Sequence, residues 1–233
     1  MKLESKKNNT IDELSWRSDS RDIGQDAWRT MRIQSEVVEG FETFRTLGPT
    51  VSVFGSARMI PENSACDWAH MIGAALSVAG VNVMTGGGGG VMEAANKGAQ
   101  SGAGLSIGLN VELPKEQLPN RFQDVAMEYR YFFIRKLMFV RYAFAYIFLP
   151  GGFGTLDELM TVVTLLQTDK MEAAPVILVG KEHWQGLIGW IDQTLKLQGF
   201  ISASDQKIFQ LVDDPMDAVN IVMDHLKSFQ TIN

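Results

Sequence analysis

The sequence has little cysteine and no long apolar run, and each shortage excludes a class of protein. The single cysteine, Cys66, excludes an intrachain disulfide. The longest apolar run, around residues 144–150, follows Arg141 and is far too short to span a bilayer. The first nine residues, MKLESKKNN, contain no apolar core of a signal peptide. We therefore expect a cytoplasmic protein without a transmembrane segment.

An excess of positive charge is also missing. The formal net charge is −6 at pH 7, which argues against a broad nucleic-acid-binding face and leaves small anionic ligands admissible. Hydrophobic residues make up 45% of the 233 residues and charged residues 21%, which is ordinary globular composition. We expect one α/β domain with an appendage, and neither a nucleic-acid nor a membrane partner.

Several catalytic signatures are absent. There is no G-x-S-x-G elbow and no G-x-x-x-x-G-K-[ST] loop, which removes the obvious acyl-transfer and nucleoside-triphosphatase readings. A dinucleotide fingerprint that starts at Gly86 would place Val91 at its third glycine. His70, His183 and His225 are widely spaced and form no metal-ligand pattern. We predict no NAD cofactor, no metal site and only surface or core roles for the histidines.

Strands and helices alternate along most of the chain. This alternation predicts a Rossmann-like, doubly wound parallel sheet of about seven strands with helices on both faces, in which ligands bind beyond the carboxyl ends of the strands. Apolar runs predict strands over 50–54, 81–85, 105–111, 125–128, 145–149, 175–179 and 208–212. Helical patterns cover 67–79, 90–100, 130–142, about 155–167, 184–197 and 216–229.

An N-terminal extension, residues 1–48, precedes this domain. Residues 1–20 are polar, with only Leu14 and Trp16 as anchors, and we expect this segment to be frayed. Residues 22–47 carry apolar side chains at intervals of three and four, which predicts an amphipathic helix. Its apolar stripe must be buried either on its own domain or against another subunit, and the sequence leaves both open.

The stretch around which the chain is arranged is 149–158, LPGGFGTLDE. Here a strand runs into a glycine turn and then a helix from about Thr155, and the uncovered N–H groups and positive helix end suit a phosphate. Glu158 then lies in the first helical turn, where a carboxylate would repel a bound anion, so we expect it to have a specific role. It acts either on the substrate or as a partner of Thr155 in a capping box, or in both ways.

Two further glycine turns follow predicted strands. Gly55 follows the first strand and residues 86–90 follow the second, so these turns and Gly151 can face one crevice. Ser56 and Arg58 either hold phosphate or serve as turn residue and solvated charge. The helix over 130–142 carries arginines among aromatic side chains, where an arbitrary arginine is more often solvated or paired structurally.

Three ordered motifs resemble those of a known family. Residues 150–158, PGGFGTLDE, match the PGGxGTxxE motif of the LOG family, the cytokinin riboside 5′-monophosphate phosphoribohydrolases, many of which were labelled "lysine decarboxylase" in error. Residues 86–99 are similar to the family's GGGxGxMEAAN turn, and residues 134–138, IRKLM, to its RKxxM segment. The resemblance covers roughly 49–229, and longer family members also resemble the run 28–42.

The resemblance implies a domain over 49–233 that hydrolyses the N-glycosidic bond of a nucleoside 5′-monophosphate, either AMP or a cytokinin riboside 5′-monophosphate. Glu158 would be the catalytic carboxylate, with Arg135 as the second catalytic residue by family match. A homodimer without a cofactor is implied. Substrate binding is expected from the following residues: Gly55, Ser56, Arg58, Gly87, Gly88, Gly89, Gly90, Glu93, Lys136, Gly151, Gly152, Gly154 and Thr155.

Two other classes compete with this hydrolase. A non-catalytic nucleotide sensor or carrier would use the same turns without needing Glu158 ionised beside Arg135. A pyridoxal-phosphate lysine decarboxylase would need a Schiff-base lysine with partners for the pyridine ring, and the sequence offers no credible arrangement of them. Which base is preferred depends on pocket shape, which the sequence leaves open.

Overall fold

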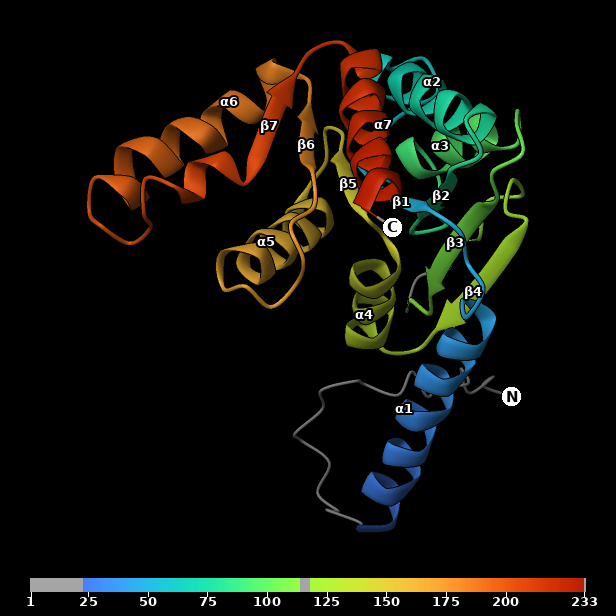
Figure 1. The fold of residues 1–233 in the computed structure, drawn as a ribbon. Coiled ribbons are helices and arrows are strands. Elements are labelled where there is room, and N and C mark those ends of the chain that lie inside the picture. The colour runs from blue at the N-terminus through green and yellow to red at the C-terminus, as the bar shows by residue number, and fades with distance from the viewer. Residues whose placement is uncertain (1–22, 114–117, 233) are drawn as a thin grey trace, which may run out of the picture.

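The computed structural model describes residues 23–113 and 118–232, and the predicted frayed segment 1–20 lies outside them. Seven parallel strands form one sheet in the order β4-β3-β2-β1-β5-β6-β7 (Figure 1). This confirms the predicted doubly wound sheet. The strands are β1 (Thr50–Phe54), β2 (Asn82–Thr85), β3 (Ser106–Val111), β4 (Val125–Tyr129), β5 (Ala145–Phe148), β6 (Val176–Val179) and β7 (Phe209–Val212).

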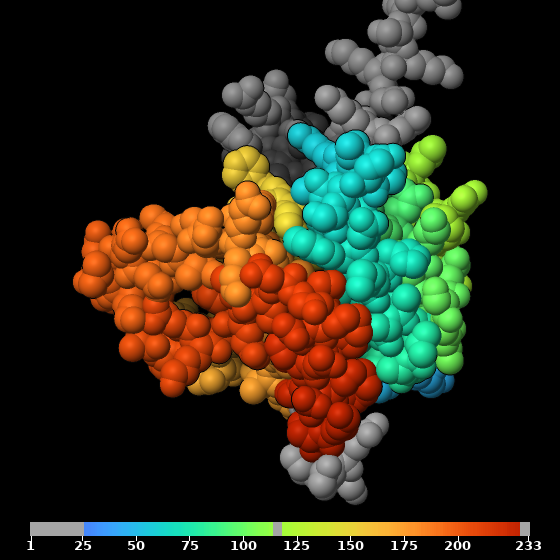
Figure 2. All heavy atoms as spheres, turned by 90° about the horizontal axis from the view of Figure 1, so that it is seen from above, coloured from blue at the N-terminus to red at the C-terminus, as the bar shows by residue number. Residues whose placement is uncertain are grey.

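Helices cover both faces of the sheet, which is why its central strands are continuous apolar runs. On one face lie α2 (Ser64–Val78), α3 (Val91–Ala99) and α7 (Pro215–Ile232). In the space-filling view the atoms of α7 fill the space between α2 and the orange segment that holds α6 and β7 (Figure 2). On the other face lie α1 (Ile23–Thr43), α4 (Phe132–Tyr142), α5 (Phe153–Gln167) and α6 (Lys181–Trp190).

The strand order reverses beside β1, which pairs with β2 on one side and with β5 on the other. Val53 lies opposite Ile147 in the β1–β5 register, so the turns that follow these two strands are neighbours. The N–H of Ser56 donates to the carbonyl of Pro150 at 3.1 Å and joins the two turns directly. A ligand crevice is expected at such a switch in strand order.

Aromatic packing fixes α4 on the sheet below this switch. The ring of Phe139 lies 4.8 Å from that of Phe54, which stacks in turn on Phe148 at 4.9 Å. The buried Tyr146 hydroxyl donates to the carbonyl of Val140 at 2.8 Å. These contacts give α4 a defined position relative to the ends of β1 and β5.

The helix predicted over 22–47 is α1, and it packs on its own domain. Its partly buried apolar residues Ile33, Val37 and Phe41 join the core around α4, and Phe44 just beyond it is 2% exposed. Trp28 remains exposed, and Figure 1 shows the N-terminal half of α1 extending away from the body of the molecule. Within the described residues, the C-terminal half of α1 is therefore the part of the extension that packs on the domain.

Candidate active site

A cavity of about 550 Å³ opens at the switch in strand order. The ends of β1 and β3 and the turns that follow β2 and β5 contribute to its wall, together with α4 and the start of α5. The structure thus brings the three glycine turns to one place. Of the residues predicted for the site, those that line the cavity are Gly55, Ser56, Arg58, Gly87, Gly88, Arg135, Gly152, Gly154, Thr155 and Glu158.

Five predicted residues, Gly89, Gly90, Glu93, Lys136 and Gly151, are not part of this lining. Gly90 precedes α3 with a φ of +60°, and a Cβ there would lie 2.5 Å from the Ser56 carbonyl oxygen. Only glycine allows this approach, and it holds the second turn against the first. Gly89 borders the Glu93 carboxylate, since a Cβ on Gly89 would lie 3.9 Å from Glu93 Oε2.

The start of α5 differs from the sequence prediction. The helix begins at Phe153 with Gly152 as its N-cap, so Thr155 is the third helical residue and Glu158 the sixth. The capping-box alternative is therefore wrong, because it requires Thr155 at the N-cap position. Among the described residues no side chain caps this end. The first intrahelical bond runs from the Leu156 N–H to the Gly152 carbonyl at 3.0 Å, which leaves earlier N–H groups at the cavity without helical partners.

The turn before α5 is held from behind by Thr155 and His183. A Cβ on Gly151 would overlap the buried Thr155 side chain, so these two residues fit together only with glycine at 151. The Gly151 N–H donates to Nε2 of His183 at 3.3 Å. His183 therefore supports the loop, a role that the sequence did not indicate because nothing near His183 resembles a motif.

Besides the exposed Arg58, the charged residues of the cavity lining are Glu158 and Arg135. Glu158 is only 4% exposed, and burial raises the pKa of its carboxyl, while Lys136 and Arg135 oppose this shift. Burial lowers the pKa of Arg135, which Glu158 and Asp157 oppose. An arginine remains charged despite such a shift because its ordinary pKa is so high. The two side chains therefore favour each other's ionised form.

The Arg135 guanidinium rests on two aromatic rings. It lies 5.2 Å from the ring centroid of Phe132 and 5.7 Å from that of Phe139, distances at which a cation is attracted by a ring. Its Nε is buried and has no hydrogen-bond partner among the described residues. None of the ion pairs found in residues 23–113 and 118–232 joins Arg135 to Glu158. Arg135 can therefore still donate a hydrogen bond, and Glu158 can still accept one, to a ligand that lies between them.

Lys136 points to α5 instead of the cavity. Its Nζ lies 2.8 Å from Asp157 Oδ2 and donates to Thr161 Oγ1 at 2.8 Å. The charge of Lys136 nevertheless reaches the site, because it is the largest of the influences that lower the pKa of Glu158. Its effect on a ligand would pass through Glu158.

A network of side-chain amides, which sequence reasoning missed, holds the Gly87 turn. Asn120 donates to the carbonyls of Gly87 and Gly88 at 3.1 and 3.0 Å, and Gln123 donates to Gly87 at 2.9 Å. The buried Asn96 accepts from Asn120 at 2.9 Å. Gly87 itself has a φ of +73°. Asn96 stands inside a motif and could have been suspected, whereas the loop over 118–123 carries no signal.

Sequence reasoning also missed part of the lining, namely Met92, Asn110, Leu113, Leu118, Phe132, Phe139 and Phe153. Phe132 and Phe139 stand three residues before and four after Arg135, a spacing that places all three on one helical face. That spacing could have revealed them. Asn110 could have been found as the polar residue near the end of the third strand, since parallel strands end at one edge.

Within 23–113 and 118–232 no group of three or more histidine, cysteine, aspartate or glutamate side chains could hold a metal ion. No helix in the described part of the chain is both long and apolar enough to cross a membrane.

Comparisons with known proteins decide the family. A family model described as "possible lysine decarboxylase" matches residues 92–222, more than half of the chain. A cytokinin riboside 5′-monophosphate phosphoribohydrolase of Mycobacterium marinum is 30% identical over 73% of this chain and 91% of its own length. The chain belongs to the LOG family. A phosphoribohydrolase of the same name from Arabidopsis thaliana is 28% identical over 68% of this chain and 74% of its own length.

A solved structure agrees on the fold. The molybdenum cofactor binding protein of Rippkaea orientalis superposes on this chain with a TM-score of 0.59, covering 78% of this chain and 99% of its own. Its identity of 21% makes this a likeness of architecture alone. The resemblance drawn from the three LOG motifs is confirmed, and the hydrolases of this family are the relatives of this chain.

Proposed function

We propose that this LOG family member is a nucleoside 5′-monophosphate phosphoribohydrolase acting on AMP or on a cytokinin riboside 5′-monophosphate. One observation carries the proposal. A buried carboxylate, Glu158, and the partly buried Arg135 line the same cavity as the start of α5, which no side chain of the described residues caps. The names of the relatives support the same reaction.

The 5′-phosphate would bind at the start of α5. Its free N–H groups and the positive end of the helix dipole favour an anion there. Arg58 lines the same cavity, is exposed, and supplies a further positive charge. Because Glu158 lies on the same helix, a phosphate held at Gly152 and Gly154 would place the ribose near its carboxylate. The bound phosphate would thereby hold the ribose in a fixed orientation relative to Glu158.

Glu158 would act on the anomeric carbon. As the bond from C1′ to the base nitrogen lengthens, the sugar takes on oxocarbenium character, which a carboxylate stabilises. Glu158 then accepts a proton from the attacking water, whose oxygen bonds to C1′. The base leaves with the electron pair of the broken bond and takes up a proton. The products are the free base and ribose 5-phosphate.

Arg135 would keep Glu158 ionised. Burial raises the pKa of the Glu158 carboxyl, whereas Lys136 and then Arg135 lower it, so Arg135 adds to the influence of Lys136 in favouring the ionised form that can serve as a base. The Nε of Arg135, for which the described residues offer no hydrogen-bond partner, would also donate to a sugar or phosphate oxygen of the substrate.

Incubation with AMP tests the proposal directly. Adenine and ribose 5-phosphate should appear in equal amounts, and adenosine should be a very poor substrate because it lacks the anchoring phosphate. A panel of nucleoside monophosphates, including isopentenyl derivatives, would identify the preferred base. Comparable turnover of adenosine and AMP would contradict the role given to the start of α5.

Binding of AMP without release of adenine would instead support the competing class, a nucleotide sensor or carrier.

The lone Cys66 and the lack of a membrane-spanning helix among the described residues support a cytoplasmic location for the proposed enzyme.

A further inference from the structure

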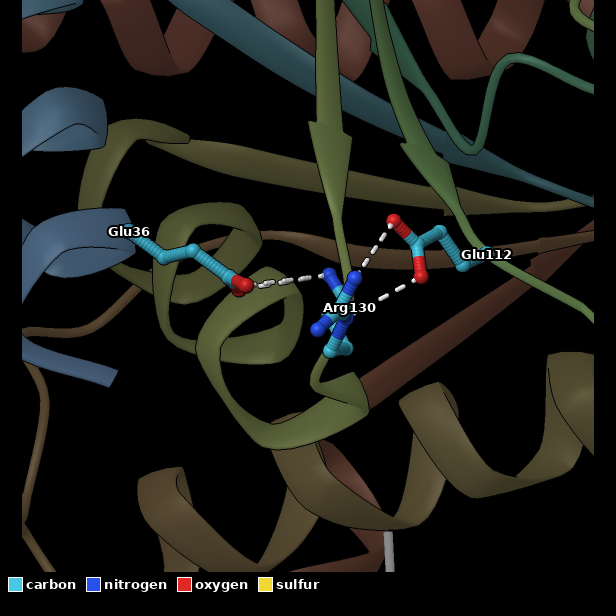
Figure 3. Close-up of polar contacts among 3 residues, drawn as sticks. All are labelled: Glu36, Glu112 and Arg130. Carbon is cyan, nitrogen blue, oxygen red and sulfur yellow. Dashed lines mark hydrogen bonds and ion pairs between the residues drawn. The ribbon is translucent and has the colours of Figure 1, made fainter. Parts of the chain in front are cut away.

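A carboxylate on α1 reaches the start of the helix that carries Arg135. Both oxygens of Glu36 lie 3.3 Å from the backbone nitrogen of Arg130, which immediately follows β4 (Figure 3). Glu36 and Arg130 are far apart in sequence, so this contact forms only in the folded domain. It joins the N-terminal extension to the junction between β4 and α4.

The side chain of Arg130 extends the contact to a second wall of the cavity. Its Nε lies 3.1 Å from Glu112 Oε2 and its NH2 nitrogen 3.4 Å from Glu112 Oε1, a two-pronged pairing (Figure 3). Glu112 stands between Val111 and Leu113, both of which line the cavity. The Glu36–Arg130–Glu112 cluster therefore links α1, the end of β3 and the start of α4.

The helix that begins at this cluster has no cap of its own. Tyr131 is the N-cap residue of α4, and its side chain does not cap the helix in the described structure. A carboxylate held beside a helix N-terminus interacts favourably with the helix dipole. Glu36 thus supplies from another helix the negative charge that a capping side chain would normally provide. Phe132 and Arg135, in the first turns that follow, line the cavity.

Contacts further along α4 keep Glu36 in place. A Cβ on Gly40 would lie 2.6 Å from Met138 Cε, so α1 and α4 approach each other closely at this glycine. Beyond it, the rings of Phe44 and Tyr142 lie 5.2 Å apart. Glu36 meets the residue before the N-cap of α4, Gly40 approaches Met138 within the helix, and Phe44 packs on its last residue, Tyr142. The docked half of α1 therefore follows α4 along its length.

We propose that Glu36 is a positioning residue for the site, and that α1 acts through Glu36 and Arg130 to fix the start of α4 and with it Arg135 and Phe132. The role of Arg135 in hydrolysis rests on the proposed function, whereas the attachment of α4 does not. By this proposal α1 contributes to the geometry of the active site in the catalytic domain.

Three variants test the proposal. Glu36→Ala removes the contact, Glu36→Gln keeps an oxygen acceptor of the same reach, and Glu42→Ala removes a carboxylate of α1 whose only described ion pair is the exposed contact with Arg45 at 3.9 Å. Hydrogen exchange of residues 131–139 reports the position of α4. AMP turnover at a temperature where each variant is folded reports the position of Arg135.

For Glu36→Ala we expect exchange at the start of α4 to rise about tenfold or more. We expect kcat to fall on the order of tenfold, since small displacements of catalytic groups have large effects on rate. KM should change less than about threefold because the phosphate-binding start of α5 is untouched. Glu36→Gln should restore most of both losses, and Glu42→Ala should behave as wild type.

Unchanged exchange in α4, or increased exchange with unchanged kcat, would overturn the proposal. An equal effect of Glu42→Ala would also overturn it. If the wild-type protein releases no adenine from AMP, the proposed function is wrong, and exchange in α4 alone then decides whether Glu36 holds the helix that carries Arg135.

Discussion

The Lys136 ammonium lies 2.8 Å from the Asp157 carboxylate, and this ion pair joins α4 to α5 beside Glu158. The pair is partly exposed, so its direct contribution to stability is small. Its importance lies in its position. Lys136 and Arg135, adjacent on α4, both favour the ionised form of Glu158, while Asp157 opposes it.

Replacing Lys136 by methionine should shift the pH dependence of hydrolysis. Burial raises the pKa of Glu158, and Lys136 is the largest opposing influence, so its removal raises that pKa further. The acid limb of the profile of kcat/KM against pH should therefore move to higher pH. Lys170→Met, which removes an exposed lysine beyond the far end of α5, is the matched control. An unmoved acid limb would show that Glu158 is not the titrating base.

Gly151→Ala should destabilise the protein, because the added methyl group meets the buried Thr155 side chain. Forcing extra volume into such a place costs about 1–3 kcal/mol of the free energy of unfolding. Gly154→Ala has open space around its new methyl group and should cost much less. Chemical denaturation of both variants measures the difference. Equal stabilities would mean that Gly151 and Thr155 do not interlock as described.

A homodimer is expected from the outer face of α4. Phe133 is 53% exposed and Leu137, one turn later, is 41% exposed, and adjacent exposed apolar side chains of this size mark contact surfaces. Light scattering at micromolar concentration should give the mass of two chains. Leu137→Glu should shift this mass towards one chain, whereas Leu197→Glu, on a residue 78% exposed elsewhere, should not. A monomeric wild type would contradict this proposal.

Much of the framework could be predicted from local patterns. Apolar runs predict all seven strands, and the glycine turns after β1, β2 and β5 predict the crevice, because parallel strands end at one edge of the sheet. Helix ends were harder. The sequence predicts that α5 begins at about Thr155, and the spacing of Thr155 and Glu158 is compatible with a cap, whereas the helix begins two residues earlier at Phe153 with a glycine N-cap.

The parts that could not be predicted depend on contacts between distant segments. Asn120 supports Gly87 from a loop whose sequence has no motif, and Glu36 meets Arg130 across 94 positions. Such pairs are fixed by how helices pack on the sheet, which no local pattern contains. The placement of Arg135 in the cavity wall could be predicted only in part. Its spacing from Phe132 and Phe139 is visible in the sequence, whereas the degree of its burial is not.

The central claim is that Glu158 is the catalytic carboxylate, and Glu158→Gln tests it because the change keeps the size of the side chain. Burial raises the pKa of Glu158, so ionising it costs stability in the folded state and glutamine avoids this cost. The variant should therefore be at least as stable as wild type at pH 7. The two should converge below pH of about 4, where the carboxyl is protonated in folded and unfolded states alike.

The decisive measurement is the rate of adenine release from bound AMP in a single turnover, for wild type and Glu158→Gln, normalised to folded protein. We predict that the variant binds AMP and that its rate falls roughly 10²-fold or more. An undiminished rate per folded molecule would contradict the mechanism, and Glu158 would then be a buried structural carboxylate.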